Sequence, residues 1–198
     1  MVLAKSPSGV GALNPNAIGA GALTIGLAGG GPAAVVNYTG ASTDMINDYS
    51  NITLNQSGTI NMNGVSDVVG SLASTPIYAA VISVPGSPTA NLVGGIPLVN
   101  GRVNLGSTPG MSLTIGASNS STSFSGVISG TGNLLKVGTG TQTLMNKNTY
   151  SGDTILTHGG ITLGINNALP TTTNLVVNSP SAAGFVACAC QACAYPPS

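Results

Sequence analysis

The side chains that could perform acid–base catalysis in this sequence are four aspartates and one histidine, because glutamate is absent. Asp44 and Asp48 lie close together in the sequence, but nothing beside them indicates a raised carboxyl pKa, and glycoside hydrolysis needs two carboxylates at a set separation. His158 lies in a glycine-rich turn, and no Gly-x-Ser-x-Gly motif is present to supply a serine nucleophile. We interpret the Asp44–Asp48 segment as a solvated loop and His158 as an exposed turn residue, and we expect no catalysis.

All three cysteines lie in the last eleven residues, at Cys188, Cys190 and Cys193. Three thiols could hold a metal ion, but zinc sites usually combine one Cys-x₂₋₄-Cys pair with a second pair of ligands, and no fourth ligand is nearby. The glycine pairs of the chain never lead into the Gly-Lys-Ser/Thr of a phosphate-binding loop. We therefore predict no metal site and no cofactor, and an irregular tail over residues 185–198.

Charge is almost absent from the chain. Only 4% of its 198 residues are charged and the net charge is zero, whereas an average soluble domain carries about 25% charged residues. Without a basic stripe, binding to nucleic acid has no electrostatic basis. The polar groups are instead those of 22 Ser, 21 Thr and 19 Asn, and so weakly charged a surface favours self-association.

The elements that must position these residues are short strands. Glycine, asparagine, threonine and proline are abundant and disfavour helices, so a helical bundle is excluded. Triplets of apolar, polar and apolar residues recur along the chain, and each ends at Gly or Asn, which tolerate positive φ. These segments are Leu23–Gly26, Ile52–Asn55, Ile60–Asn63, Val103–Gly106, Leu113–Gly116 and Ile161–Gly164. The pattern predicts many strands of three to five residues joined by tight turns.

Strands this short with corners this frequent favour an all-β, right-handed parallel β-helix, or β-solenoid, over a sandwich or barrel. The 42% of hydrophobic residues would form inward ladders, and Thr, Ser and Asn would face outward. With about 22 residues per coil, the chain would make roughly nine rungs. Low charge suits this geometry, because like charges stacked on successive rungs would repel. The open ends of a solenoid would promote end-to-end association.

One segment of 48 residues, from Ser123 to Pro170, carries paired glycines, a lysine and an Asn-Thr-Tyr run. Its distinctive residues are Phe124, Gly126, Gly130, Gly132, Leu134, Lys136, Gly138, Gly140, Leu144, Asn148, Thr149, Tyr150, Gly152, Thr154, Gly160, Leu163 and Gly164. This pattern resembles the autotransporter-associated β-strand repeat, also called the passenger-associated transport repeat, of Gram-negative autotransporters. The resemblance implies an extracellular β-helix that is secreted through an outer-membrane barrel, with this repeat helping the passenger to fold and emerge.

Within that resemblance Lys136 and Tyr150 would be structural. Gln142 stands where the family usually has an apolar residue, so a buried Gln142 needs hydrogen-bond partners such as a stacked amide ladder. We divide the chain into β-helical coils over residues 1–122, the repeat and a following coil over residues 123–184, and the cysteine-containing tail. The glycine-diluted stretch 17–34 is a poor signal peptide, so we expect any export signal to lie upstream of this sequence.

The sequence thus predicts a non-catalytic fragment of a secreted or surface-displayed passenger of a Gram-negative bacterium, serving as a stalk or adhesin. Its expected partners are neighbouring coils of a longer passenger, and glycans or cell surfaces. Two alternatives stay open. An ice- or surface-binding solenoid would use a flat threonine face, to which Thr139, Thr141 and Thr143 could belong and which Thr171–Thr173 interrupts. A carbohydrate-active β-helix enzyme would need an acid site at Asp44 or Asp153.

Overall fold

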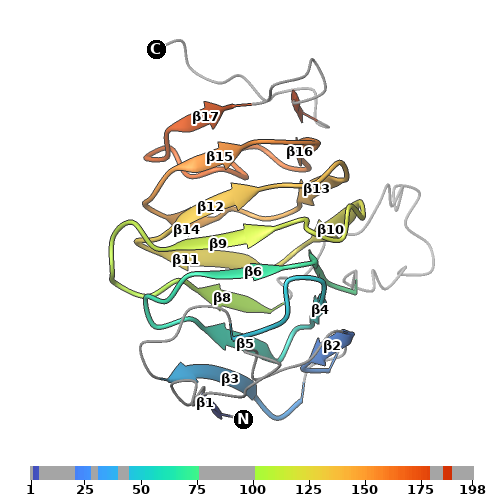
Figure 1. Ribbon diagram of the computed structural model, residues 1–198, viewed down its shortest axis with the longest axis vertical. Helices are drawn as coiled ribbons and strands as arrows, with labels where there is room; N and C mark the ends of the chain where they lie inside the picture. The colour runs from blue at the N-terminus through green and yellow to red at the C-terminus, as the bar shows by residue number, and fades with distance from the viewer. Residues whose placement is uncertain are drawn as a thin grey trace, which may run out of the picture.

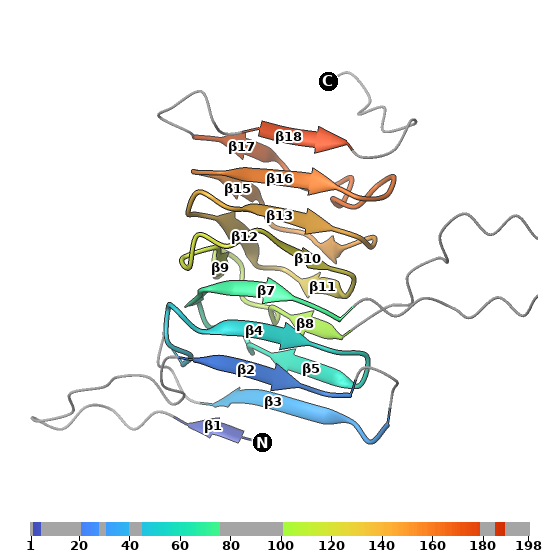
Figure 2. The same ribbon diagram turned by 90° about the vertical axis from the view of Figure 1, so that its right-hand side faces the viewer.

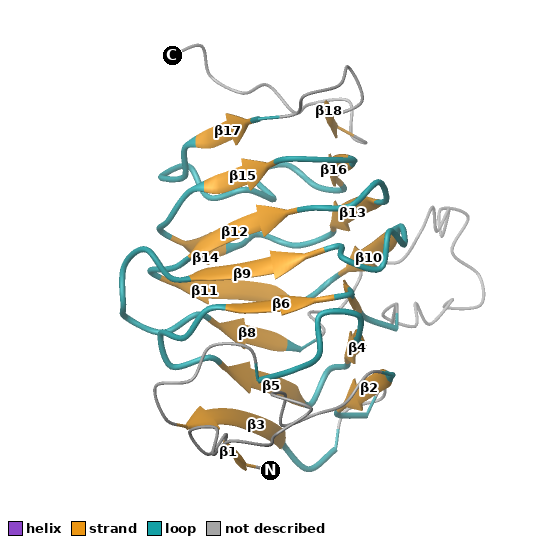
Figure 3. Cartoon of the chain, in the orientation of Figure 1, coloured by secondary structure: helices purple, strands orange, loops and turns teal. Residues whose placement is uncertain are grey.

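Parallel ladders of short strands build the whole of the described structure. The computed structural model describes residues 2–4, 21–27, 31–39, 45–75, 101–178 and 185–188, with side chains described except at 2–4 and 185–188. All regular elements in these ranges are strands and none is a helix (Figure 3). The strands stack into a β-solenoid of about 5 turns (Figures 1 and 2). The all-β parallel solenoid expected from the sequence is confirmed.

The solenoid has three faces. The first face contains β1 (Val2–Ala4), β3 (Ala34–Thr39), β5 (Gly58–Asn61), β8 (Arg102–Asn104), β11 (Val127–Gly130) and β14 (Thr149–Tyr150). The second face contains β6 (Asp67–Val69), β9 (Ser112–Ile115), β12 (Asn133–Lys136), β15 (Thr154–Leu156) and β17 (Leu175–Val177). The third face contains β2 (Ala22–Ile25), β4 (Asn51–Leu54), β7 (Ser71–Ala73), β10 (Thr122–Phe124), β13 (Thr141–Leu144), β16 (Gly160–Leu163) and β18 (Phe185–Cys188), with β7 lying beside β10.

The chain visits the faces in turn, so each residue pairs with one a rung further on. In the upper rungs this offset is close to 20 residues, as where Ser123 pairs with Thr143. It is larger elsewhere: Thr24 pairs with Thr53, and Ile60 with Val103 because residues 76–100 intervene in the sequence. The expected rung length is therefore near the observed one, but the expectation of roughly nine rungs is wrong. The sequence boundary at 122/123 lies inside β10.

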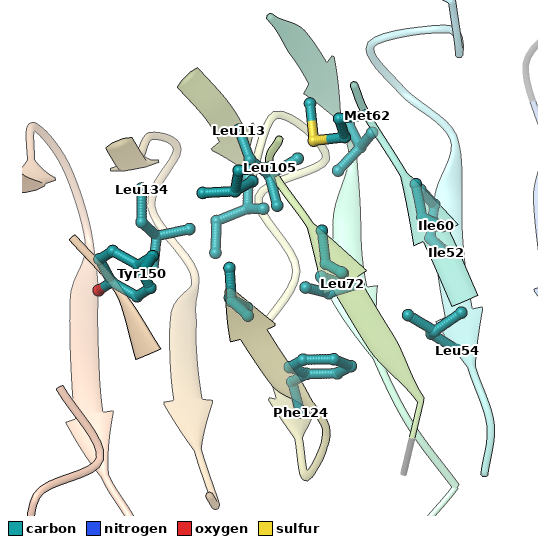
Figure 4. Close-up of a cluster of buried hydrophobic side chains, with 14 of the residues drawn as sticks. Ile52, Leu54, Ile60, Met62, Leu72, Leu105, Leu113, Phe124, Leu134 and Tyr150 are labelled. Carbon is teal, nitrogen blue, oxygen red and sulfur yellow. The ribbon is translucent and has the colours of Figure 1, made fainter. Parts of the chain in front are cut away.

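Hydrophobic side chains from all three faces fill the interior (Figure 4). Alternation within each strand turns every second side chain inward, and parallel pairing places these side chains on top of one another. Ile60, Val103 and Ile128 form one such ladder on the first face, and none of the three is more than 3% exposed. The inward aliphatic ladders predicted from the sequence are present.

Glycines stack at the corners as well. Gly116, Gly138 and Gly159 all have positive φ and turn the chain from the second face to the third. A β-carbon on Gly138 would lie 2.0 Å from the carbonyl oxygen of Gly116, and one on Gly159 would lie 2.5 Å from that of Gly138. Successive corners thus approach too closely for any side chain, which explains why glycine recurs there.

The end of the chain departs from expectation. Residues 185–188 form β18, which pairs in parallel with β16, whereas residues 185–198 were expected to be irregular. The physical reason is that β16 offers an unpaired edge on which a short apolar segment can add a strand. Cys190, Cys193 and the side chain of Cys188 lie outside the description. The described ranges hold no helical segment with the length and hydropathy needed to cross a membrane.

Candidate functional site

The residues that could have formed a catalytic site lie apart. Asp48 is half-buried in the turn before β4, whereas Asp153 precedes β15 several rungs away and accepts a hydrogen bond from Asn174 Nδ2 at 3.0 Å. His158 is exposed in the turn between β15 and β16. Asp44 lies outside the described residues. Over the described part of the chain, no three histidine, cysteine or acidic side chains gather closely enough to hold a metal ion.

A buried carboxylate, Asp67, was missed by the sequence reasoning. Its Oδ2 accepts hydrogen bonds from the Tyr38 hydroxyl at 2.6 Å and from the Ile46 backbone N–H at 3.2 Å, and its Oδ1 accepts from the Val68 N–H at 2.9 Å. Asp67 is 2% exposed. Its place in an alternating run between Val65 and Val69 was the signal that it points inward. It ties β3, the segment around Ile46 and β6 together.

The residues of the suggested repeat form part of the wall and corners of the upper rungs. Those buried in strands are Phe124, Leu134, Lys136, Leu144, Tyr150, Thr154 and Gly160, while Leu163 is half-buried and Thr149 exposed. Those at corners or strand ends are Gly126, Gly130, Gly132, Gly138, Gly140, Gly152 and Gly164. Asn148 is buried between β13 and β14. None of these side chains lines a shared cleft, and their arrangement indicates a structural role.

Asn148 connects three successive rungs. Its Oδ1 accepts a hydrogen bond from the Ile128 N–H at 2.8 Å in the rung on one side. Its Nδ2 donates to the Ala168 carbonyl at 2.7 Å on the other side and to the Asn146 carbonyl at 3.2 Å in its own rung. A single buried amide therefore satisfies backbone groups that the strand ladders leave unpaired at this corner.

Lys136 is a buried amine in an aliphatic ladder. It lies between Ile115 and Leu156 on the second face and is 1% exposed. Its Nζ donates hydrogen bonds to the carbonyl oxygens of Val137 and Gly138, the latter at 3.0 Å. Desolvation by burial lowers the pKa of Lys136 from 10.5 to about 8. The amine thus closes the turn beneath the glycine corner, and its position favours a structural role over ligand contact.

Tyr150 starts a chain of buried hydroxyls. Its hydroxyl lies 2.6 Å from Thr154 Oγ1, which lies 2.9 Å from Thr173 Oγ1, and Thr173 donates to the Gly152 carbonyl at 2.7 Å. Because the proton of Thr173 is used at Gly152, Thr154 donates to Thr173 and Tyr150 donates to Thr154. Desolvation raises the pKa of Tyr150 to about 12, although its hydroxyl hydrogen bonds act in the opposite direction. The geometry therefore needs Tyr150 protonated.

Gln142 is buried, as expected, but its partner is a threonine. Thr122 in the preceding rung donates from Oγ1 to Gln142 Oε1 at 3.0 Å, and Gln142 Nε2 donates to the carbonyls of Thr122 and Thr143. On the other side Gln142 pairs with Ile161. The stacked amide ladder suggested for this position is therefore wrong. An amide pair occurs instead on the outside of the first face, where Asn61 Nδ2 donates to Asn37 Oδ1 at 2.7 Å.

Outward side chains also stack in columns, and these are the surfaces open to a partner. On the third face one column runs along β2, β4, β7, β10, β13 and β16, the strands that lie in one layer in Figure 2. Its members are Thr24, Thr53, Ala73, Ser123, Thr143 and Thr162. Of the threonines considered for a flat face, Thr143 belongs to this column and Thr141 to the neighbouring one, whereas Thr139 lies in a turn and Thr173 is buried.

Comparison with known proteins adds one relative. No family model matches the sequence, and no solved structure matches it. The Adhesin BmaC autotransporter of Brucella suis biovar 1 (strain 1330) is 32% identical over 159 aligned residues, which cover 65% of this chain. This chain is similar to an autotransporter adhesin. It spans 4% of the length of that relative, whose printed description is that of an adhesin and not of an enzyme.

Proposed function

We propose that this chain is a non-catalytic part of a cell-surface passenger of the autotransporter type, a stalk or adhesin of a Gram-negative bacterium. The observation that carries the proposal is a parallel β-solenoid in a chain that is similar in sequence to an adhesin autotransporter. The dispersed positions of Asp48, Asp153 and His158 support a role without catalysis.

A solenoid suits such a role because each rung is held by the next along its full length. Backbone ladders run along all three faces, and side chains such as Asn148 and Gln142 add hydrogen bonds between rungs. A rod built in this way transmits force through many parallel bonds and can be extended by further coils. Its partners at the two ends would be neighbouring coils of a longer passenger, or a second copy joined end to end.

The suggested repeat at residues 123–164 would assist folding and secretion. Its rungs are joined by hydrogen bonds at offsets of 20 residues, from Ile128 to Asn148 and from Asn148 to Ala168. A stable segment of this kind can act as a template onto which later rungs add. Folding on the outer side of the membrane would then draw the remaining chain outward.

The test is display on intact cells of the bacterium that encodes the chain. An antiserum against residues 101–178 should label unbroken cells, and brief protease treatment of these cells should remove the label while a periplasmic marker survives. Deleting the parent gene should reduce attachment to surfaces. Labelling that appears only after lysis would contradict the proposal.

A further inference from the structure

The outward column of the third face consists largely of hydroxyls. We use the name hydroxyl column for Thr24, Thr53, Ser123, Thr143 and Thr162. Thr24 pairs with Thr53, and Ser123 with Thr143 and then Thr162, so the residues follow one another rung by rung. Ala73 stands between the two groups, because it pairs with Thr53 and the Ser74 N–H donates to the Ser123 carbonyl at 3.0 Å.

The hydroxyl column differs from the other outward columns in its hydrogen bonding. Elsewhere the outward polar groups bind one another or the backbone: Asn61 donates to Asn37, Asn174 donates to Asp153, and Ser71 donates to Asn51. Within the described ranges, the five hydroxyls of the hydroxyl column make no hydrogen bond to protein atoms. Because each hydroxyl can donate and accept, the column presents a row of unused hydrogen-bonding groups to a ligand.

The third face also lacks charge. The described strands of this face contain no Lys, Arg, Asp or Glu. The cations Arg102 and Lys147 lie instead on the first face and in the turn before β14. An anionic polymer would find no counter-charge here, and a polycation would find no carboxylate. The complementary ligand is therefore uncharged and carries hydroxyls of its own.

The hydroxyls form a line and not a two-dimensional array. The neighbouring outward column of the same face includes Ala22 and Gly160, and its Ser71 and Ser121 hydroxyls are already bonded to Asn51 and to the Thr141 N–H. A flat crystalline lattice such as ice would need several equivalent rows. A line of groups spaced roughly 4.8 Å apart matches an extended chain whose units advance by a similar length. Pyranose units in an extended β-1,4-linked polysaccharide do so.

We infer that the hydroxyl column binds an uncharged, β-linked polysaccharide that lies along the solenoid axis with about one sugar per rung. This inference names the ligand class of the proposed adhesin and rests on that function. Each sugar contact is weak, since an exposed hydroxyl contributes little net free energy. Successive contacts along one rigid row act together, so affinity grows with the length of the polysaccharide.

The experiment measures retention of the full 198-residue chain on microcrystalline cellulose, with amylose as the α-linked control. The variant Thr53→Val/Thr143→Val/Thr162→Val replaces three hydroxyls of the column by methyl groups of the same shape. The matched control Thr59→Val/Thr149→Val makes the same change on the first face. We expect wild type and control to bind cellulose, with release by long cello-oligosaccharides, and the triple variant to bind at least tenfold more weakly.

Circular dichroism must show the same β-sheet spectrum for all three proteins. If the triple variant does not fold, Thr143→Val and Thr162→Val are measured singly, and each should weaken binding. The inference is overturned if wild type ignores cellulose, binds amylose equally well, or binds cellulose undiminished after the column is changed. Thermal hysteresis that is lost in the triple variant would assign the face to ice instead. Surface labelling of intact cells is independent of all these results, so failure here leaves the proposed function standing.

Discussion

At the scale of single residues, buried polar side chains in this solenoid bind the rungs on either side of their own. Asn148, Gln142 and Thr154 each reach a group about 20 residues away, which is one turn of the coil. A buried polar group without a partner would cost about 1–3 kcal/mol, so each of these bonds also fixes which residues face each other. Two of the buried groups are titratable, Tyr150 and Lys136, and they make the stability of the fold depend on pH in opposite directions.

For Tyr150 we expect stability to fall at high pH. The folded pKa is about 12 against an ordinary 10, so the folded state holds the proton more tightly than the unfolded state. The contribution is complete below pH 10 and is lost as the pH rises toward 12. Denaturant unfolding at a series of pH values should show this loss in wild type and a smaller one in Tyr150→Phe. Equal pH dependence in the two proteins would contradict the assignment.

For Lys136 we expect the reverse. The folded pKa is about 8 against an ordinary 10.5, so the unfolded state binds the proton more tightly. The unfolding free energy should therefore rise between pH 8 and 10.5, and this contribution is lost as the pH falls through 8. Lys136→Met keeps the aliphatic contacts and removes the amine. Its unfolding midpoint, followed by circular dichroism, should lack the rise, and Lys147→Met, which alters an exposed lysine, should retain it.

At the scale of elements, strands and corners obey different constraints. A strand needs only alternating residues, so its hydroxyls and aliphatic groups can vary within their class. A corner brings backbones of successive rungs together, and at Gly138 the carbonyl of Gly116 occupies the space that a side chain would need. Corners therefore tolerate substitution far less than strands do.

The corner can be tested with two glycines that share the left-handed conformation. Gly138 has φ 66° and no room for a β-carbon, whereas Gly110 has φ 81° and nothing within 4 Å of one. Gly110→Ala should cost only the conformational strain, about 1–2 kcal/mol. Gly138→Ala adds overpacking against the neighbouring rung and should cost about 3 kcal/mol or more. Urea unfolding of both variants gives the comparison, and equal losses would show that corner crowding is unimportant.

Elements with local signals were predictable from the sequence. The triplets around Ile60 and Leu113 became strands because alternation and β-branched residues suffice for that, and the parallel stacking followed from their shortness. The partner of Gln142 was not predictable, since it depends on which residue lies one rung below. The short strand at Phe185–Cys188 was missed because its stability comes from the edge of β16 and not from its own composition.

For the candidate site, the sequence correctly placed His158 in an exposed turn and anticipated a buried Gln142. The hydroxyl column was only partly visible, because Thr24, Thr53 and Thr143 are far apart in the sequence. Which residues align depends on the lengths of the intervening segments. Those lengths also explain the wrong rung number, since one average coil length cannot represent offsets that range from 20 residues at Ser123 to 43 at Ile60.

At the scale of the whole molecule, the solenoid is continuous across the longest of these segments. β5 pairs directly with β8, although residues 76–100 lie between β7 and β8 in the sequence. Both ends of that segment meet Asn55: the Thr75 N–H donates to Asn55 Oδ1 at 3.2 Å, and a β-carbon on Gly101 would lie 3.0 Å from the Asn55 carbonyl oxygen. The rungs therefore need little chain to connect Thr75 with Gly101.

We accordingly expect that replacing residues 76–100 with a short Gly-Ser linker leaves the solenoid intact. The shortened protein should keep its β-sheet circular dichroism, and its unfolding midpoint should change by less than that of Gly138→Ala. Loop-closure entropy changes slowly with length, so a short flexible connection is thermodynamically acceptable. Loss of the β-sheet signal would mean that these residues contribute to the core.

The offset of 20 residues between partners in the upper rungs has a consequence for how such a chain can change over generations. A tandem duplication of one such unit would insert a rung whose every neighbour finds its accustomed counterpart, from Asn148-type amides to corner glycines. The molecule would lengthen by roughly 4.8 Å and otherwise keep its cross-section. Reach from the cell could therefore be adjusted in small, nearly neutral steps by recombination alone.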